Sequence, residues 1–162
     1  MKLKHSLSML LLAMASMFRL GAREECHNVA STVGTHSTGA LALECQTAAI
    51  ATRYLLVQKG TADNQFIVNI ATTRPWGVVA DEPAVGDLAT VLLCGCMPGT
   101  MKMVANAAVT VGSPVYTAAG GKVSPTFGAT LYMVGRALSP AAADGDLIEV
   151  AHCFPLLNSA VL

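Results

Sequence analysis

The sequence predicts an all-β protein, a small β-barrel or β-sandwich that carries an N-terminal helix or extended arm. One observation behind this prediction is the regular punctuation of the chain from Arg74 onward, where short apolar runs recur roughly every eight to twelve residues between Gly, Pro and Asp. The other is a unit that occurs twice, at residues 76–94 and 134–153. Such repetition defines the building block of a domain, and two copies are too few for a solenoid.

The two copies of this unit share their first step, their turn and their last residue. Each starts with a residue followed by glycine (Gly77 and Gly135), reaches a Gly-Asp pair, and ends in a cysteine (Cys94 and Cys153) seven residues after the aspartate. The later copy has one extra residue in its turn. Because side chains alternate between the two sides of a strand, equivalent residues of the two copies should point to the same side. We expect inward side chains at Val91 and Val150 and outward side chains at Thr90 and Glu149.

Nine segments have the composition of strands. They are rich in Val, Leu, Ile and aromatic residues, and turn residues such as the pair Gly120-Gly121 separate them. Residues 40–52 have a weak pattern that fits either a helix or an extended segment. The predicted strands cover residues 53–59, 66–71, 76–80, 88–95, 101–106, 114–118, 122–125, 131–138 and 147–154.

The composition indicates a component of a larger assembly. Charged residues make up 12% of the chain, about half of the roughly 25% expected of a soluble domain. No charged residue lies between Met103 and Gly121, and the formal net charge is zero. A small domain with so little charge is best explained by burial of its surface against other protein. The absence of a basic stripe argues against direct binding of nucleic acid.

The first 20 residues form an apolar segment with a basic start. Their apolar run, residues 7–17, is shorter than the roughly 20 residues that cross a bilayer, so we expect no membrane span. We divide the chain into an apolar arm or helix at residues 1–30 and a β-rich domain at residues 31–162. The arm is expected to dock on a neighbouring subunit through Leu7, Leu11, Met14 and Phe18. A secretory signal peptide is the alternative, because the segment also has the composition of one.

The cysteines could carry chemistry, but buried free thiols are the favoured interpretation. Five cysteines cannot all pair within one chain, so we expect folding in a reducing compartment. The sequence Cys94-Gly-Cys96 and the pair His152-Cys153 could approach one another and hold zinc if the two copies pair. The Cys-x-Cys spacing is shorter than that of usual zinc ligands. A metal site and a redox pair therefore remain the less favoured alternatives.

Signatures of an enzyme are absent from the sequence. It contains no Gly-x-Ser-x-Gly elbow and no phosphate-binding loop. The acidic residues lie where turns need a side chain that bonds to its own backbone, which favours turn formation over calcium binding. We expect no catalytic, cofactor-binding or metal-binding residues and no cofactor. Trp76, the single tryptophan, is expected to pack in the core or to anchor a subunit contact.

Three segments in order, GVVADEPAVGDLATVLLCG, GTMKMVANAAVTVGSPVYTAAGGKVS and LYMVGRALSPAAADGDLIEVAHCFP, resemble the head-decoration or capsid cement proteins of tailed bacteriophages. The resemblance covers residues 57–155. It implies a β-rich protein that forms oligomers, often trimers, on the outside of a capsid and stabilises it, without catalytic residues. The apolar N-terminus and the cysteines depart from the family pattern.

Together these observations predict a structural virion protein that is made in the host cytoplasm and binds the exterior of a phage capsid. Its expected partners are the major capsid protein and itself, as a homotrimer. Alternatives are a secreted or periplasmic β-domain and a cysteine-based metal-binding domain or enzyme. The loop at residues 97–103 is expected to expose its methionines beside a Pro-Gly turn. The expected contact residues outside the arm are Trp76, Met97 and Met101.

Overall fold

The computed structural model describes residues 39–157, which lie within one compact unit (Thr35–Leu162). The fold is all-β, as the sequence predicts, and the one helix among the described residues is a short 3₁₀ turn, η1 (Ala119–Gly121). The predicted arm and its boundary at residue 30 lie outside the described residues and stay predictions. The strands are β1 (Ala40–Cys45), β2 (Leu56–Lys59), β3 (Gln65–Val68), β4 (Gly77–Val79), β5 (Leu88–Leu93), β6 (Met101–Val104), β7 (Pro114–Thr117), β8 (Val123–Ser124), β9 (Tyr132–Ala137), β10 (Leu147–Ala151) and β11 (Leu156–Leu157).

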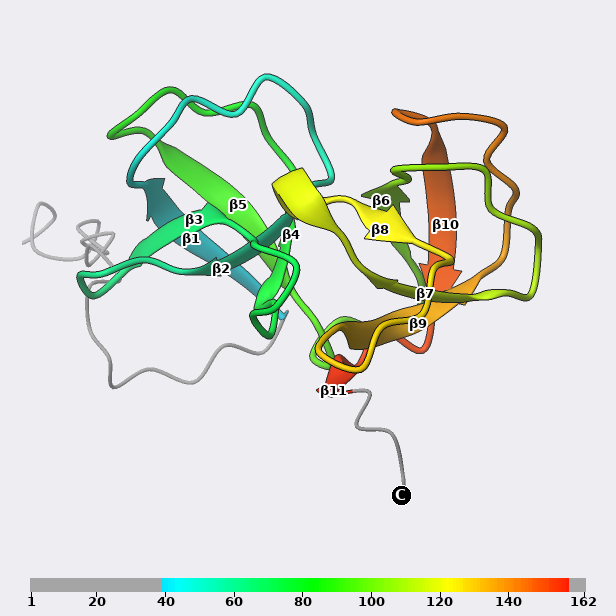
Figure 1. Ribbon diagram of the computed structural model, residues 1–162. Helices are drawn as coiled ribbons and strands as arrows, with labels where there is room; N and C mark the ends of the chain where they lie inside the picture. Colours follow the sequence, from blue (N-terminus) through cyan, green and yellow to red (C-terminus); the bar gives the residue numbers. More distant parts are fainter. Residues whose placement is uncertain (1–38, 158–162) are drawn as a thin grey trace, which may run out of the picture. The chain divides into compact units, whose positions relative to one another are not determined.

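The first five strands form a closed barrel in the order β1-β3-β2-β4-β5 (Figure 1). Strand β1 pairs antiparallel with β5 along five residues, and parallel with β3 through Glu44 opposite Gln65 and Cys45 opposite Phe66. This parallel pairing closes the barrel, so each of its strands has a neighbour on both sides.

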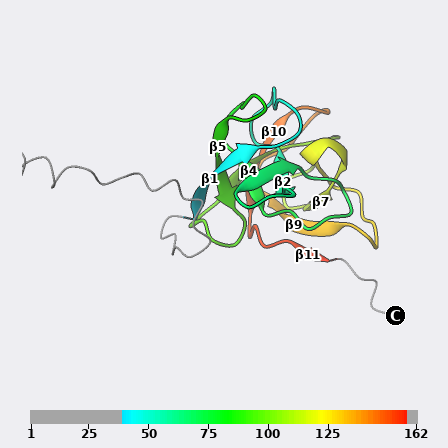
Figure 2. The same ribbon diagram turned by 90° about the vertical axis from the view of Figure 1, so that its left-hand side faces the viewer.

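The next five strands form a curled sheet in the order β6-β10-β9-β7-β8, and β11 lies beside β9. Just after β6, Ala105 forms a parallel bridge with Val123 of β8, and the amide of Asn106 donates to the Val123 carbonyl (2.8 Å). The curled sheet therefore repeats the strand order of the barrel, with β6, β7, β8, β9 and β10 in the places of β1, β2, β3, β4 and β5. Figure 2 views the molecule from the side of the barrel.

The hydrogen bonds of the two sheets correspond in their turns. In each sheet the Gly-Asp pair of the turn makes two hydrogen bonds with one residue at the end of the first strand. The glycine amide donates to the carbonyl of that residue, and the amide of that residue donates to the aspartate carbonyl. In each sheet the aspartate side chain also accepts an amide of its own turn. The two backbone bonds, each given donor first, are Gly86 to Cys45 (2.8 Å) and Cys45 to Asp87 (2.9 Å) in the barrel. In the curled sheet they are Gly145 to Ala105 (2.9 Å) and Ala105 to Asp146 (2.8 Å).

The glycine at the start of each repeated stretch is required by close packing of backbone. A Cβ atom on Gly77 would overlap the carbonyl oxygen of Leu92, and a Cβ atom on Gly135 would overlap that of Ala151. Each glycine lies beside the strand that ends its unit. Gly77 pairs with Leu93 of β5, and Arg136, the residue after Gly135, pairs with Ala151 of β10. A larger residue at either position would push the two strands apart.

Two apolar cores hold the described residues together. The core of the barrel is built around Phe66 and Val91. The second core joins both sheets, because Leu56 of β2 and Val78 of β4 pack with side chains of the curled sheet such as Met103 and Ile148. The amide of Gly121 donates to the carbonyl of Asn69 (3.1 Å) across the same boundary.

The predicted strands match the observed ones at most positions. Val91 and Val150 are buried while Thr90 and Glu149 are exposed, which confirms the predicted faces. Residues 40–45, where the sequence left helix and extended structure open, form β1 because this segment closes the barrel. The expected strand at residues 53–59 begins later, at Leu56, and β11 was not expected.

Candidate docking surface

Three of the predicted contact residues lie in the described part of the chain. Trp76 precedes β4 and is 41% exposed, and Met97 is half-buried in the linker between β5 and β6. Met101 is only 3% exposed and Met103 is fully buried. The expectation that these two methionines are exposed is wrong, because β6 directs both side chains into the second core. Leu7, Leu11, Met14 and Phe18 lie outside the described residues.

Backbone bonds place Trp76 at the end of the barrel where β5 finishes. Its amide donates to the carbonyl of Val57 (2.8 Å), and its carbonyl accepts the amide of Cys94 (2.9 Å). The Trp76 side chain is thus outside the barrel while its backbone is part of the sheet. Neither bond constrains the indole, which is free to contact a partner.

Phe154 lies over the linker that joins the two sheets. Gly95 has φ +79°, and a Cβ atom there would lie 2.8 Å from Cδ2 of Phe154, so the ring packs on bare backbone. The guanidinium of Arg74 lies 5.7 Å from the centre of the same ring, within the range of a cation–π contact. Arg74 forms no ion pair with a carboxylate of the described residues.

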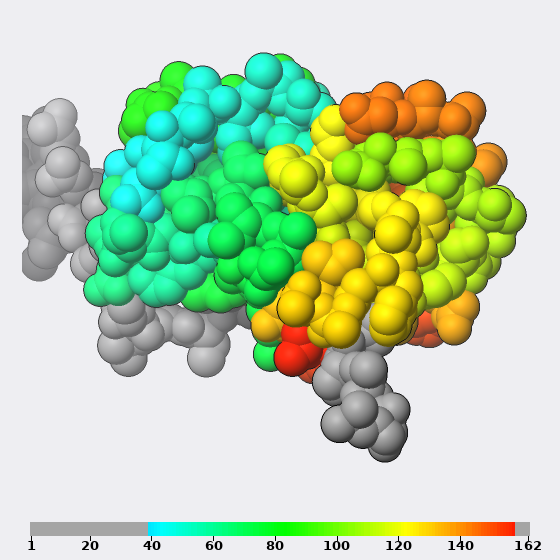
Figure 3. All heavy atoms as spheres, viewed as in Figure 1, coloured from blue at the N-terminus to red at the C-terminus, as the bar shows by residue number. Residues whose placement is uncertain are grey.

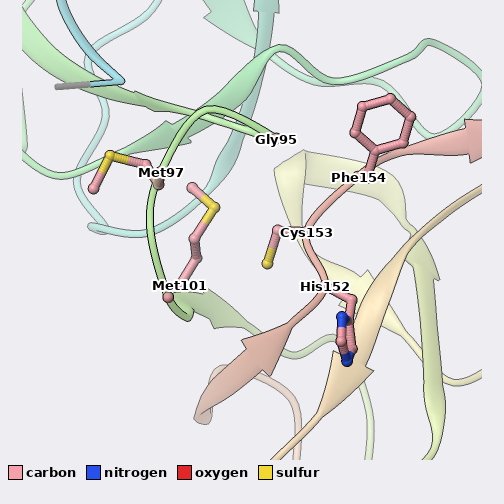
Figure 4. Close-up of a pocket in the computed structure, with 7 residues that line it drawn as sticks. Gly95, Met97, Met101, His152, Cys153 and Phe154 are labelled. Carbon is pink, nitrogen blue, oxygen red and sulfur yellow. The ribbon is translucent and has the colours of Figure 1, made fainter. Parts of the chain in front are cut away.

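Two shallow hollows adjoin these side chains. One, of about 360 Å³, lies between the linker and the segment after β10, with Met101 and Cys153 beside it (Figure 4). The other, of about 270 Å³, is lined by Arg74, Trp76 and Pro155 among others. Both are open and shallow, so neither encloses a small molecule as a deep binding pocket would.

Strand β11 extends this region with two more exposed apolar side chains. Leu156 and Leu157 pair with β9 and, among the described residues, with no other strand. In Figure 1 and Figure 2 β11 lies at the lower edge of the described part, and Figure 3 shows its residues (red) at the surface. We call the exposed side chains of this region, Arg74, Trp76, Phe154, Leu156 and Leu157, the junction surface.

Near the junction surface, the thiols of Cys94 and Cys153 are neutral and packed, whereas Cys96 is exposed. Burial, followed by the neighbouring Cys153 and Cys96, raises the pKa of Cys94 to about 12. Burial likewise raises the pKa of Cys153 to about 11, and the Cys153 thiol donates to the carbonyl of Val150 (3.2 Å). A protonated thiol is a poor nucleophile and a poor metal ligand. Within residues 39–157, no three side chains among His, Cys, Asp and Glu are grouped as a metal site would require.

The sequence predicts a contact role for Trp76 and makes no such prediction for its neighbours on the junction surface. Phe154 is the last residue of the predicted strand 147–154, and Leu156 lies just beyond it, after the cysteine that matches Cys94 in the repeat. The available signal was the run of apolar residues after Cys153, which the earlier copy lacks. Arg74 carried no signal, because its contact with Phe154 joins residues far apart in the chain. In the described part, no helix is long and apolar enough to cross a membrane.

The fold consists of two sheets with the same strand order, and the junction surface is an apolar face suited to contact with other protein. These are features of a structural protein. A family model described as phage cement protein matches residues 36–152, which is well over half of the chain. The chain belongs to the phage cement protein family. This confirms the resemblance, and it gives the protein a structural, capsid-associated role in the virion.

Among solved structures, the head fiber gp8.5 N base of bacteriophage phi29 is similar to this chain. It has 21% sequence identity and a TM-score of 0.53, and the match covers 76% of this chain and 97% of that one. At this identity the likeness shows a shared fold. No curated protein matches the chain.

Proposed function

We propose that the protein binds the outer surface of a phage capsid lattice and stabilises it as a homotrimeric cement protein, with the major capsid protein as its partner. The observation that carries the proposal is the family match over residues 36–152. The low charge of the chain and the exposed apolar side chains of the junction surface support it. Many weak contacts made at once by an oligomer add up to strong binding on a lattice.

We also propose that the N-terminal segment contributes contacts. Residues 1–20 would act as an intersubunit arm with Leu7, Leu11, Met14 and Phe18 as its anchors, joined to the β-rich domain of residues 31–162. Synthesis in the host cytoplasm is part of the proposal. The four cysteines of the described residues are free thiols, which is consistent with folding in a reducing compartment.

Co-sedimentation with purified capsids that lack the protein tests the proposal. We expect saturable binding and capsids that withstand a higher temperature before they release DNA. The double variant Leu11→Ala/Phe18→Ala should bind capsids at least about tenfold more weakly than wild type. Truncation of an apolar anchor costs on the order of 2 kcal/mol of binding free energy. The matched control Ser8→Ala/Ser16→Ala, in the same segment, should bind like wild type.

Wild-type protein that stays in the supernatant at every concentration would refute capsid binding. Unchanged occupancy of capsids by the Leu11→Ala/Phe18→Ala variant, with the wild type bound, would refute only the role of the arm. Far-UV circular dichroism of each variant checks that the β-domain is folded.

A further inference from the structure

A second group of exposed apolar side chains lies on the turn between β4 and β5. Val85 is 55% exposed and Leu88 is 66% exposed. Single exposed apolar residues are common on proteins, but two within four positions on one turn make a patch. We call the exposed side chains of this turn, Asp81, Glu82, Val85, Asp87 and Leu88, the acidic turn.

The acidic turn carries a charge opposite to that of the junction surface. It has three carboxylates, and one cation, Arg53, lies 3.4 Å from Glu82 with both side chains about half exposed. Such an exposed pair contributes little stability, so Glu82 can exchange its partner at small cost. The junction surface has the cation Arg74 and no carboxylate.

These two surfaces cannot meet within one chain. The acidic turn leads into β5 at Leu88, whereas Trp76 bonds to Cys94 just after the last residue of β5. The six residues of β5 hold the two surfaces roughly 17 Å apart at the rise of a strand. Figure 1 shows the turn before β5 at the top and β11 at the bottom.

We propose that the acidic turn of one copy docks on the junction surface of the next, so that copies of the protein join head to tail. Val85 and Leu88 would cover the apolar side chains around Trp76, and Glu82 would pair with Arg74. Tryptophan and arginine are the residues that most often dominate such contacts. Because different surfaces meet, the contact generates a ring when its rotation closes. This inference rests on the proposed homotrimer and names the two surfaces that form it.

A charge exchange between the two surfaces tests the inference. Multi-angle light scattering after gel filtration should show an oligomer for the wild-type full chain. Arg74→Glu and Glu82→Arg should each lower the association constant about tenfold or more, since each places like charges in contact. The double variant Arg74→Glu/Glu82→Arg restores opposite charges and should recover most of the association. Arg136→Glu, an exposed residue of β9 outside both surfaces, makes the same charge change and should leave the oligomer intact.

Three outcomes of the association measurements would overturn the inference: a monomeric wild type, single variants that associate like wild type, or a double variant no better than the singles. Loss of capsid binding by Arg74→Glu with its oligomer intact would also overturn it, because the junction surface would then receive the capsid protein. Wild-type co-sedimentation separates this inference from the proposed function. A monomer that binds capsids refutes head-to-tail assembly and the homotrimer but leaves capsid binding in place, and an oligomer that does not bind capsids refutes capsid binding alone.

Discussion

The barrel β1–β5 and the curled sheet β6–β10 have the same strand order and the same turn hydrogen bonds. They differ in the path of the chain after the equivalent cysteines, Cys94 and Cys153. After Cys94 the chain turns, with the amide of Cys96 donating to the carbonyl of Leu93 (3.3 Å), and crosses into β6. After Cys153 it continues to β11, which pairs with β9. The equivalents Trp76 and Val134 differ accordingly, since Trp76 is exposed and Val134 is fully buried. The difference shows that the frame is fixed by backbone bonds, whereas the surface depends on where the chain goes next.

The two sheets also use different side chains to accept the amide at equivalent positions of β5 and β10. In the barrel the carboxylate of Asp81 accepts the amide of Thr90 (2.7 Å). In the curled sheet the hydroxyl of Ser139 accepts the amide of Glu149 (2.8 Å). Any short side chain with an acceptor oxygen satisfies this amide. The difference matters for the surface, because only the barrel gains a negative charge there, and that charge belongs to the acidic turn.

Substitution of the paired glycines should have the largest effect on stability. Gly77→Ala and Gly135→Ala each place a methyl group against a carbonyl oxygen of the opposite strand, and we expect a loss of about 4 kcal/mol or more in the free energy of unfolding. Gly86→Ala and Gly145→Ala are the matched controls, since a Cβ atom meets nothing within 4 Å at either position. Their positive φ should cost only about 1–2 kcal/mol. Urea titration measures all four, and equal losses at all four would contradict the role of close packing.

The turn aspartates should show a smaller effect that differs between the two sheets. The Asp146 carboxylate accepts the amides of Ala142 (2.7 Å) and Ala143 (2.9 Å), whereas that of Asp87 accepts only the amide of Ala84 (3.1 Å). Alanine at Asp146 should therefore cost about 2 kcal/mol and alanine at Asp87 about 1 kcal/mol. Asparagine retains an acceptor oxygen and should recover part of each loss. A larger loss at Asp87 than at Asp146 would show that these bonds do not set the difference.

The equivalent cysteines should give the smallest effect, visible only at alkaline pH. Burial raises the pKa of Cys94 to about 12, above the value of about 8.5 in an unfolded chain. Above pH ~8.5 the unfolded state loses this proton and the folded state keeps it, so stability is complete below that pH and declines as pH rises toward the folded pKa. We expect wild type to lose up to about 1 kcal/mol per pH unit more than Cys94→Ala between pH ~9 and ~11.

Urea titrations at several pH values measure this slope. Cys96→Ala, which changes an exposed thiol two residues away, is the control and should stay close to the wild-type slope, because burial and not Cys96 is the main cause of the raised Cys94 pKa. The Cys153→Ala slope should differ less from wild type, since the pKa of Cys153 is raised only to about 11. Parallel slopes for wild type and Cys94→Ala would contradict a buried, neutral Cys94.

Local patterns determined much of the fold. Alternation predicted the buried Val91 and Val150, and the pairing of apolar runs with Gly-Asp turns predicted an all-β protein, because both signals act within a few residues. The same patterns could not decide between helix and strand at residues 40–52. That segment became β1 through its pairing with β3 and β5, which come from later in the sequence.

By itself the sequence determined most of the strands between residues 53 and 154, the repeated turn and the low charge that indicates an assembly component. Only the tertiary structure decided that Met101 is buried, that Phe154 covers Gly95, and that Arg74 lies against an aromatic ring. The reason is physical. Alternation and turn chemistry depend on neighbours in the chain. The junction surface instead forms where the barrel, the linker and the last strand come into contact, and these contacts depend on how both sheets fold.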